Sequence, residues 1–542
     1  MKLCCSILAL ICFASSAFAQ TKTWVYLNDK PNQTEFLLSP AKYLSTQAIE
    51  KRAKYNINID VKDIPIHKNY IDELANYGAV VAQSKWLNAV VVSAEEAQLA
   101  IIENLPFVKS VVPTKTYVFK LKEDESTFFS AKTSVYNIGD YGAAYNQITA
   151  LNGDCLHNFG FEGEGITIAV CDNGFTGVDN LEAFEHLYTN GTLKGHYNFV
   201  TNNIDVFDNG SHGTNVLSTM AAYLPNAFIG VAANANYYLF KTEDNSSETI
   251  MEEFNWIMAA EFADSAGVDI ITTSLGYSNF NDSTTSHTYE DMDGNTTPIS
   301  RAADIAASKG MLVVVSAGNE GRSDWKYITA PSDADSALCI AAVDFAGARA
   351  IFSSVGPSSD GDQKPNVAAP GVSVTVLRSN GEIATSNGTS FSGPLVAGMA
   401  ACLWQALPNK SNMDIFNIIQ ESASQFNNPD TLLGYGIPNF CNAFFNNFNL
   451  DSELLTMEEP RIFPNPINEN IELLYKASEN DEIEIGVYDM RGKQVYLENY
   501  FVMEGNFYRY QIPISHAASA ATYLVRIKTN SKTHLLKALK VK

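Results

Sequence analysis

The sequence predicts an α/β fold for the central part of the chain, residues 135–446, built on a doubly wound, mostly parallel sheet. Short apolar runs there have the length and composition of buried strands, and they alternate with helical segments. Such alternation is typical of βαβ units, whose helices cover both faces of a parallel sheet. The expected strands cover residues 166–170, 237–241, 268–273, 311–316 and 337–343.

Two smaller units flank this domain. Residues 20–130 predict a small α+β unit, and residues 461–542, after a linker at 451–460, predict an antiparallel β-sandwich with tight turns. In the first unit we expect strands at 22–27 and 86–93, one or two more strands within 108–121, and helices at 45–54 and 94–104. In the last unit we expect strands at 483–488, 494–497, 523–528 and 533–541. Ser45 and Ser93 are the expected amino-terminal caps of the two helices.

Residues 1–19 predict a secretory signal peptide, because a lysine precedes an apolar run that ends in the small-residue pattern Ala-Phe-Ala at 17–19. The run is shorter than a membrane span, and no other apolar stretch approaches 18 residues. We therefore expect an exported protein without a transmembrane segment.

The composition excludes some partners. The formal net charge is −24 at pH 7, and 46% of the residues are hydrophobic, which is ordinary for a soluble protein. So acidic a surface repels nucleic acid and anionic membranes. We expect neither as a partner, and we expect a monomer.

Five of the eight cysteines follow the expected signal peptide. Cys171, Cys339 and Cys402 lie in apolar strands or helices and are expected to be small core residues. Cys155 and Cys441 flank the central domain, and a bridge between them is one pairing that the sequence leaves open.

A glycine-rich turn at residues 388–394, GTSFSGP, precedes an apolar run at 395–404 that suits a buried helix with Pro394 in its first turn. The turn would place Ser390 at the amino end of that helix, where unpaired N–H groups and the helix dipole favour developing negative charge. Ser390 is therefore a candidate nucleophile, although a loop that merely caps a core helix would give the same pattern. Ser392 is expected inside the helix, with its hydroxyl bonded to the preceding turn.

Three further polar residues lie after strands or at the start of helices, where open α/β sheets place their ligands. Asp172 ends the first strand, His212 precedes a helix expected at 216–223, and Asn319 follows the fourth strand in a glycine turn. Each alone also fits a structural role, as a turn aspartate, a helix cap or a left-handed turn asparagine. With Ser390 they supply a base-orienting carboxylate, a base, an oxyanion donor and a nucleophile.

The chain order Asp, His, Ser and the blocks AVCDNGF, GSHGTNV, TSLGY, VVVSAGNEG, KPNVAAPG and GTSFSGP resemble the subtilisin-like serine proteases, the subtilases of peptidase family S8. The resemblance spans residues 166–394. It implies a subtilisin-like fold and a serine endopeptidase that requires no cofactor. It also implies that two segments bind the substrate, one pairing with it strand on strand, and together form the walls of the specificity pocket. Their residues are Ser274, Leu275, Gly276, Ser316, Ala317 and Gly318.

The flanking units resemble accessory domains of exported proteases. Residues 20–130 resemble the inhibitory propeptide of secreted subtilases, with 123–133 as the expected cleavage region and a permanent structural domain as the alternative. Residues 461–542, with FPNP at 463–466 and a lysine-rich final strand, resemble the sorting domain of type IX secretion in Bacteroidetes; a substrate-docking β module is the alternative. The sorting interpretation implies the type IX machinery as a partner, and release or attachment at the cell surface.

Asp291, Asp293 and Asn295 have a spacing that could supply oxygen ligands to a structural calcium ion. The segment lacks the twelve-residue frame and the terminal glutamate of an EF-hand. We therefore favour a solvated acidic turn and keep calcium as the alternative.

The leading hypothesis is an exported serine endopeptidase, made as a self-processing zymogen, that hydrolyses protein or peptide substrates in flexible segments. The alternative is a catalytically inactive surface binding protein on a subtilase scaffold, against which the full set of four site residues argues. A lipase or esterase is disfavoured by the residue order and by the lack of a G-x-S-x-G elbow at Ser390.

Overall fold

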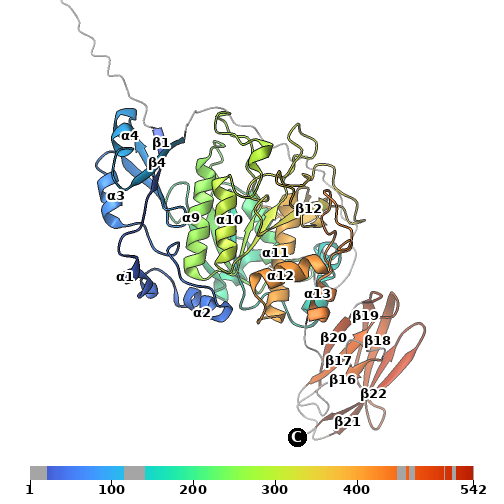
Figure 1. Cartoon of the computed structure of the whole chain (residues 1–542). Coiled ribbons are helices and arrows are strands. Elements are labelled where there is room, and N and C mark those ends of the chain that lie inside the picture. Colours follow the sequence, from blue (N-terminus) through green and yellow to red (C-terminus); the bar gives the residue numbers. More distant parts are fainter. Residues whose placement is uncertain are drawn as a thin grey trace, which may run out of the picture.

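The computed structural model describes residues 21–114, 141–447, 459–462, 470–505, 507–514 and 521–540. The expected signal peptide, cleavage region and FPNP motif lie outside these residues. Figure 1 shows a central α/β domain with a small unit against one side and a β-rich unit at the carboxyl end of the chain. Among the helices of the described ranges, none combines the length and apolarity needed to cross a membrane.

The central domain is built on a seven-stranded sheet in the order β13-β12-β11-β10-β5-β9-β6, in which every neighbouring pair is parallel. Its strands are β5 (Thr167–Asp172), β6 (Leu193–Asn198), β9 (Asn236–Lys241), β10 (Ile270–Thr273), β11 (Leu312–Ser316), β12 (Ala337–Val343) and β13 (Val367–Pro370). The α/β prediction is confirmed, and the five expected strands lie within two residues of their predicted bounds. The sequence missed β6 and β13, the two edge strands.

Helices cover both faces of this sheet (Figure 1). The main ones are α8 (His212–Ala221), α9 (Met251–Ala266), α10 (Pro298–Ser308) and α11 (Thr389–Ala406). Ala169 and Ile271 belong to the core formed with α9 and α10, whereas Ile168 and Ile270 belong to the core formed with α8 and α11. Successive strand residues thus face opposite helix layers, which is why these strands are apolar throughout.

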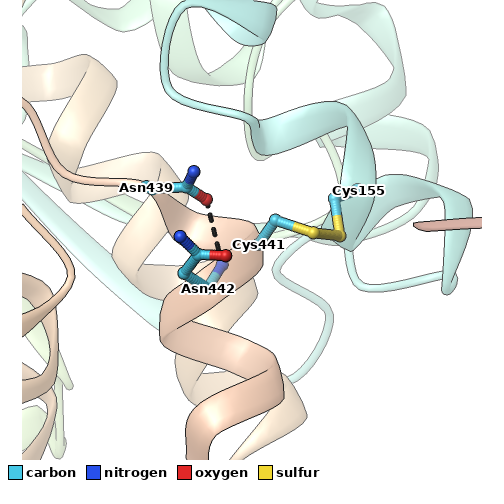
Figure 2. Close-up of a disulfide and its surroundings, with 4 residues drawn as sticks. All are labelled: Cys155, Asn439, Cys441 and Asn442. Carbon is cyan, nitrogen blue, oxygen red and sulfur yellow. Dashed lines mark hydrogen bonds between the residues drawn. A yellow bond between two sulfur atoms is a disulfide. The ribbon is translucent and has the colours of Figure 1, made fainter. Parts of the chain in front are cut away.

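Shorter elements complete the central domain. They are α5 (Tyr145–Thr149), α6 (Gly153–Asn158), η2 (Glu182–Phe184), α7 (Glu185–Thr189), β7 (Tyr223–Leu224), β8 (Phe228–Ile229), η3 (Tyr289–Asp291), β14 (Val374–Leu377), β15 (Ile383–Ser386), α12 (Asn412–Glu421) and α13 (Phe440–Asn447). A disulfide joins Cys155 of α6 to Cys441 of α13, with their Cα atoms 5.5 Å apart (Figure 2). The remaining cysteines of the described chain, Cys171, Cys339 and Cys402, are free and buried, as expected.

The amino-terminal unit is a four-stranded antiparallel sheet in the order β2-β3-β1-β4, and two of its helices pack on one face. Its elements are β1 (Thr21–Leu27), α1 (Gln33–Leu37), η1 (Pro40–Lys42), α2 (Thr46–Tyr55), α3 (Lys68–Leu74), β2 (Ala79–Ser84), β3 (Ala89–Ala94), α4 (Glu96–Ile102) and β4 (Val108–Thr114). Val25 and Val90 face α3 and α4, whereas Trp24 and Val91 pack into the core formed with α9 and α10.

One of the two expected helix caps is correct. Ser45 caps α2 by accepting a hydrogen bond from the N–H of Ala48 at 3.1 Å. Ser93 does not cap α4, because β3 continues through Ala94 and Ser93 pairs with Lys22 in the sheet. The helix therefore begins at Glu96, with Glu95 as a cap that makes no side-chain bond.

The carboxyl-terminal unit consists of two antiparallel sheets, β16-β17-β20 and β19-β18-β21-β22. Their strands are β16 (Arg461–Ile462), β17 (Asn470–Lys476), β18 (Asp481–Asp489), β19 (Gln494–Val502), β20 (Phe507–Pro513), β21 (Ala521–Lys528) and β22 (Thr533–Lys540). Ile471 and Ile512 of the first sheet share a buried core with Val487 and Val525 of the second. The predicted β-sandwich is confirmed.

Candidate active site

Ser390 is the second residue of α11 and therefore lies at the amino end of this helix. The helix starts at Thr389, six residues earlier than expected, so Pro394 lies inside it and not in its first turn. A proline at this position lacks the N–H that would bond the carbonyl of Ser390, four residues earlier. Ser274 Oγ donates to that carbonyl at 2.9 Å and replaces the missing bond.

Ser392 is fully buried in α11, as expected, but its hydroxyl is not bonded to the preceding turn. Its Oγ has no hydrogen-bond partner in the described part of the chain. A Cβ added at Gly371 would lie 2.4 Å from this Oγ, so the hydroxyl points toward the segment that follows β13. Ser392 is thus a buried residue of the helix, as the sequence predicts.

Asp172 and His212 meet where β5 ends beside the start of α8. His212 Nδ1 and Asp172 Oδ1 are 2.8 Å apart, and the N–H of Asn173 donates to the same Oδ1 at 2.8 Å. Asp172 is fully buried, whereas the His212 side chain is 32% exposed. A Cβ at Gly213 would lie 3.0 Å from Asp172 Cβ and 2.5 Å from the carbonyl of Gly174, so glycine permits this close approach.

His212 also lies beside the amino end of α11. Its ring centroid is 6.0 Å from that of Phe391, the neighbour of Ser390. Ser390 Oγ lies 3.5 Å from the carbonyl of Ser274, near the limit for a hydrogen bond. Residues 172, 212 and 390, far apart in the sequence, thus gather at one end of the sheet.

Asn319 faces the same helix end. Its Oδ1 accepts hydrogen bonds from the N–H and the Oγ1 of Thr389, both at 3.0 Å, which leaves Nδ2 as the donor. A Cβ added at Gly388 would lie 3.7 Å from this Nδ2 and 3.6 Å from the N–H nitrogen of Ser390. Two donors therefore border one small space beside the serine, as an oxyanion hole requires.

The two expected substrate-binding segments follow neighbouring strands. Residues 274–276 continue from β10 and residues 316–318 from β11, and Thr273 pairs with Val315 in the parallel ladder. Ser316 Oγ donates to the carbonyl of Thr389 at 2.9 Å, which ties its segment to α11.

Within the described chain, the backbone N–H and C=O groups of Leu275 and Gly276 have no hydrogen-bond partner. Backbone groups in this state can pair with an extended peptide, as an exposed strand does. The open edge lies next to Ser274, whose hydroxyl contacts the carbonyl of Ser390.

The acidic loop before α10 uses its carboxylates within the loop. Asp291 Oδ2 accepts from the N–H and the Oγ1 of Thr288, and Asp293 accepts from the N–H groups of Asn295 and Thr296. Carboxylates that cap their own loop in this way are typical of an acidic turn, which is the interpretation favoured from the sequence. Calcium binding by this loop stays a prediction.

A second acidic group gathers near the amino end of α9. Oxygens of Glu243, Glu248 and Glu252 lie within 4.8 Å of one another, the one such cluster among the described residues. Burial and the two neighbouring carboxylates raise the pKa of Glu252, whose oxygens accept from the N–H groups of Asp244 and Thr249. We assign no metal to this cluster.

Glu261 of α9 binds the amino-terminal unit, a role that the sequence did not predict. It accepts hydrogen bonds from Ser84 Oγ at 2.6 Å and from the N–H groups of Lys85 and Trp86 at 2.9 and 3.0 Å. These groups belong to the last residue of β2 and the two residues after it, so one carboxylate holds the amino-terminal unit on α9. Glu261 is one of four acidic residues of α9, so no local sequence pattern distinguished it.

Three parts of the chain match known families. Residues 163–436 match the Subtilase family, residues 22–127 the peptidase S8 propeptide domain of Bacteroidota, and residues 461–541 the secretion system C-terminal sorting domain. Subtilisin NAT of Bacillus subtilis subsp. natto is 29% identical over 356 residues, 65% of this chain and 79% of that protein. The subtilisin of Bacillus pumilus is 30% identical over 282 residues, 51% of this chain and 90% of that protein.

The chain is a serine-type endopeptidase, which is a hydrolase. This class follows from the parallel α/β sheet, from the polar side chains gathered at one end of it and from the similarity to the subtilisins. The chain belongs to the subtilase family. Its sorting domain of the type IX kind indicates export across the outer membrane, to the cell surface or the medium. This class agrees with the leading hypothesis from the sequence, and not with the alternative of an inactive binding protein.

Proposed function

We propose that this subtilase is made as a self-processing zymogen in which Asp172, His212 and Ser390 form the catalytic triad. The observation that carries the proposal is the 2.8 Å hydrogen bond between His212 Nδ1 and Asp172 Oδ1, beside the helix end that bears Ser390. Asn319 acts as the side-chain donor of the oxyanion hole.

In the proposed reaction, Ser390 Oγ attacks the peptide carbonyl while His212 Nε2 takes its proton and then gives that proton to the leaving amine. Asp172 holds the histidine tautomer and stabilises the imidazolium. Asn319 Nδ2 and the Ser390 N–H bind the oxyanion of the tetrahedral intermediate. Water then hydrolyses the acyl-enzyme, with His212 acting again as base and acid.

The substrates are proteins or peptides in extended conformation. The unpartnered backbone of Leu275 and Gly276 supports strand-like binding, which recognises main chain irrespective of sequence. Cleavage of unfolded or flexible segments follows, because most backbone N–H and C=O groups of a folded substrate are already hydrogen-bonded and cannot pair with the protease. The sorting domain adds the type IX secretion machinery as a partner during export.

Intact mass of secreted wild type and Ser390→Ala, produced side by side, tests the proposal. We expect wild type to lose about 110 residues at its amino end and the variant to keep them. If both chains kept the propeptide, self-processing would be wrong. If both lost it, another protease would do the processing.

A serine-directed phosphonate tests the nucleophile independently of maturation. We expect it to add one label to Ser390 of the wild type and none to Ser390→Ala. An unlabelled, correctly folded wild type would contradict the triad.

A further inference from the structure

Thr329 lies between the two walls that we propose for the pocket of the P1 side chain, the substrate residue whose carbonyl is attacked. A Cβ added to Gly276 on one wall would lie 2.1 Å from Thr329 Oγ1. A Cβ added to Gly318 on the other wall would lie 3.2 Å from the same oxygen. This single hydroxyl is therefore close to the backbone of both walls and occupies the space between them.

The segment that carries Thr329 is fixed on either side. Tyr277 and Ala330 exchange backbone hydrogen bonds of 2.8 and 3.1 Å, and the N–H of Ile328 donates to the carbonyl of Val355 at 3.0 Å. Thr329 itself is 3% exposed. Because both chain neighbours are held, the backbone of Thr329 cannot move away from the two walls without the loss of these bonds.

The hydroxyl is also unpartnered. Thr329 Oγ1 is buried and has no hydrogen bond in the described part of the chain. Such a group costs about 1–3 kcal/mol when it stays unpaired. The hydroxyl thus fills space between the walls and has no partner among the described residues that would fix it elsewhere.

We propose that Thr329 forms the floor of a short pocket and restricts this protease to small P1 side chains, with exclusion of aromatic ones. The inference rests on the proposed function, because it assigns specificity to that same site. An aromatic ring would need the volume between Gly276 and Gly318 that the threonine fills. An alanine or serine side chain is shorter than an aromatic ring, so it needs less depth and fits above the threonine.

The test measures kcat/KM for peptide p-nitroanilides that differ only at P1, with alanine, serine, leucine or phenylalanine, using the secreted product of the full chain. A misfit of one methylene in a pocket is worth about 10–200-fold. We therefore expect wild type to cleave the alanine or serine peptide at least about 10-fold more efficiently than the phenylalanine peptide.

Variants test whether the volume of the Thr329 side chain, and not a general effect of substitution, sets the P1 preference. Thr329→Ala is expected to raise the ratio of phenylalanine to alanine cleavage at least about 10-fold. Thr329→Val keeps the volume and should keep the wild-type ratio. Thr272→Ala is the matched control, since Thr272 of β10 is also buried with an unpartnered hydroxyl, and it should keep the wild-type ratio too.

A wild type that prefers phenylalanine or leucine at P1 would overturn the inference, even if no Thr329 variant folded. An unchanged ratio in a folded Thr329→Ala would overturn it as well. By contrast, no hydrolysis of any peptide, together with no phosphonate label on Ser390, would overturn the proposed function itself.

Discussion

Arg52 of the propeptide domain donates to both carboxylate oxygens of Asp264 in α9, at 2.7 and 3.0 Å. The same guanidinium donates to Asp63 at 2.6 Å, and Lys309, the C-cap of α10, donates to Asp63 at 2.8 Å. All four side chains are almost fully buried. The propeptide domain is therefore held by an ion cluster at the carboxyl ends of α9 and α10, in addition to the contact of its sheet with these helices.

Loss of the Arg52 guanidinium is expected to weaken this attachment. In Arg52→Ala, the carboxylates of Asp264 and Asp63 stay buried with fewer partners, which typically costs about 3–5 kcal/mol. Calorimetric unfolding of the precursor in a Ser390→Ala background measures the change. The control is Glu50→Ala on the exposed side of α2, with an expected effect within about 0.5 kcal/mol. An effect of Arg52→Ala as small as that of the control would contradict the role of the cluster.

Asn319→Ala should lower kcat on the order of 100-fold or more, because one of the two proposed oxyanion donors is lost. Thr389 also loses the acceptor of two hydrogen bonds, so the unfolding temperature must be measured beside the steady-state kinetics. We expect a folded enzyme with a strongly reduced kcat. Turnover near that of the wild type would remove Asn319 from the mechanism.

Gly388→Ala tests the oxyanion space without removal of either donor. The new Cβ would lie 3.6 Å from the Ser390 nitrogen and 3.7 Å from Asn319 Nδ2, where it would crowd the proposed position of the oxyanion. We expect a loss of kcat on the order of 100-fold, as for loss of a donor. Gly361→Ala is the control, since Gly361 also has a positive φ but no atom near its Cβ position. Equal activities of the two variants would place the oxyanion elsewhere.

The disulfide between Cys155 and Cys441 closes a loop across most of the protease domain, with a sequence separation of 286. Its removal in Cys155→Ser/Cys441→Ser is expected to lower the free energy of unfolding by about 2–5 kcal/mol. Thermal unfolding with and without dithiothreitol measures this loss. Reductant should destabilise the wild type and leave the double variant unchanged; an equal response of both would mean that the bridge does not stabilise the domain.

His287 should give the loop before α10 a stability that depends on pH. Burial lowers the pKa of His287, but its 2.5 Å hydrogen bond to Glu253 and the charge of that carboxylate raise it above 6.5 overall. Since the folded pKa is the higher one, the stabilisation is complete below pH 6.5 and is lost as the pH rises through the folded value. The unfolding temperature of His287→Gln should therefore fall further below wild type at pH 5.5 than at pH 9. A difference independent of pH would contradict this account.

Much of the central domain could be predicted because its signals are local. Asp172 ends an apolar strand, and Ser390 lies in a glycine-rich turn before an apolar helix. Open α/β sheets bring strand ends and helix starts together at one end of the sheet, so both side chains could be placed there from the sequence. The exact helix start could not be predicted, because Pro394 is tolerated inside α11 only through the bond from Ser274 to the carbonyl of Ser390. The unpartnered hydroxyl of Ser392 likewise depends on what packs against the helix.

The sequence alone determined the α/β class, the family resemblance and the residues of the proposed triad, because these follow from periodicity and short motifs. Only the tertiary structure decided that Arg52 meets Asp264, 212 residues away, and that Thr329 fills the space beside Gly276 and Gly318. Neither contact has a local pattern. Both form because β-strands and helices distant in the chain pack together, and packing depends on the whole fold and not on neighbours in sequence.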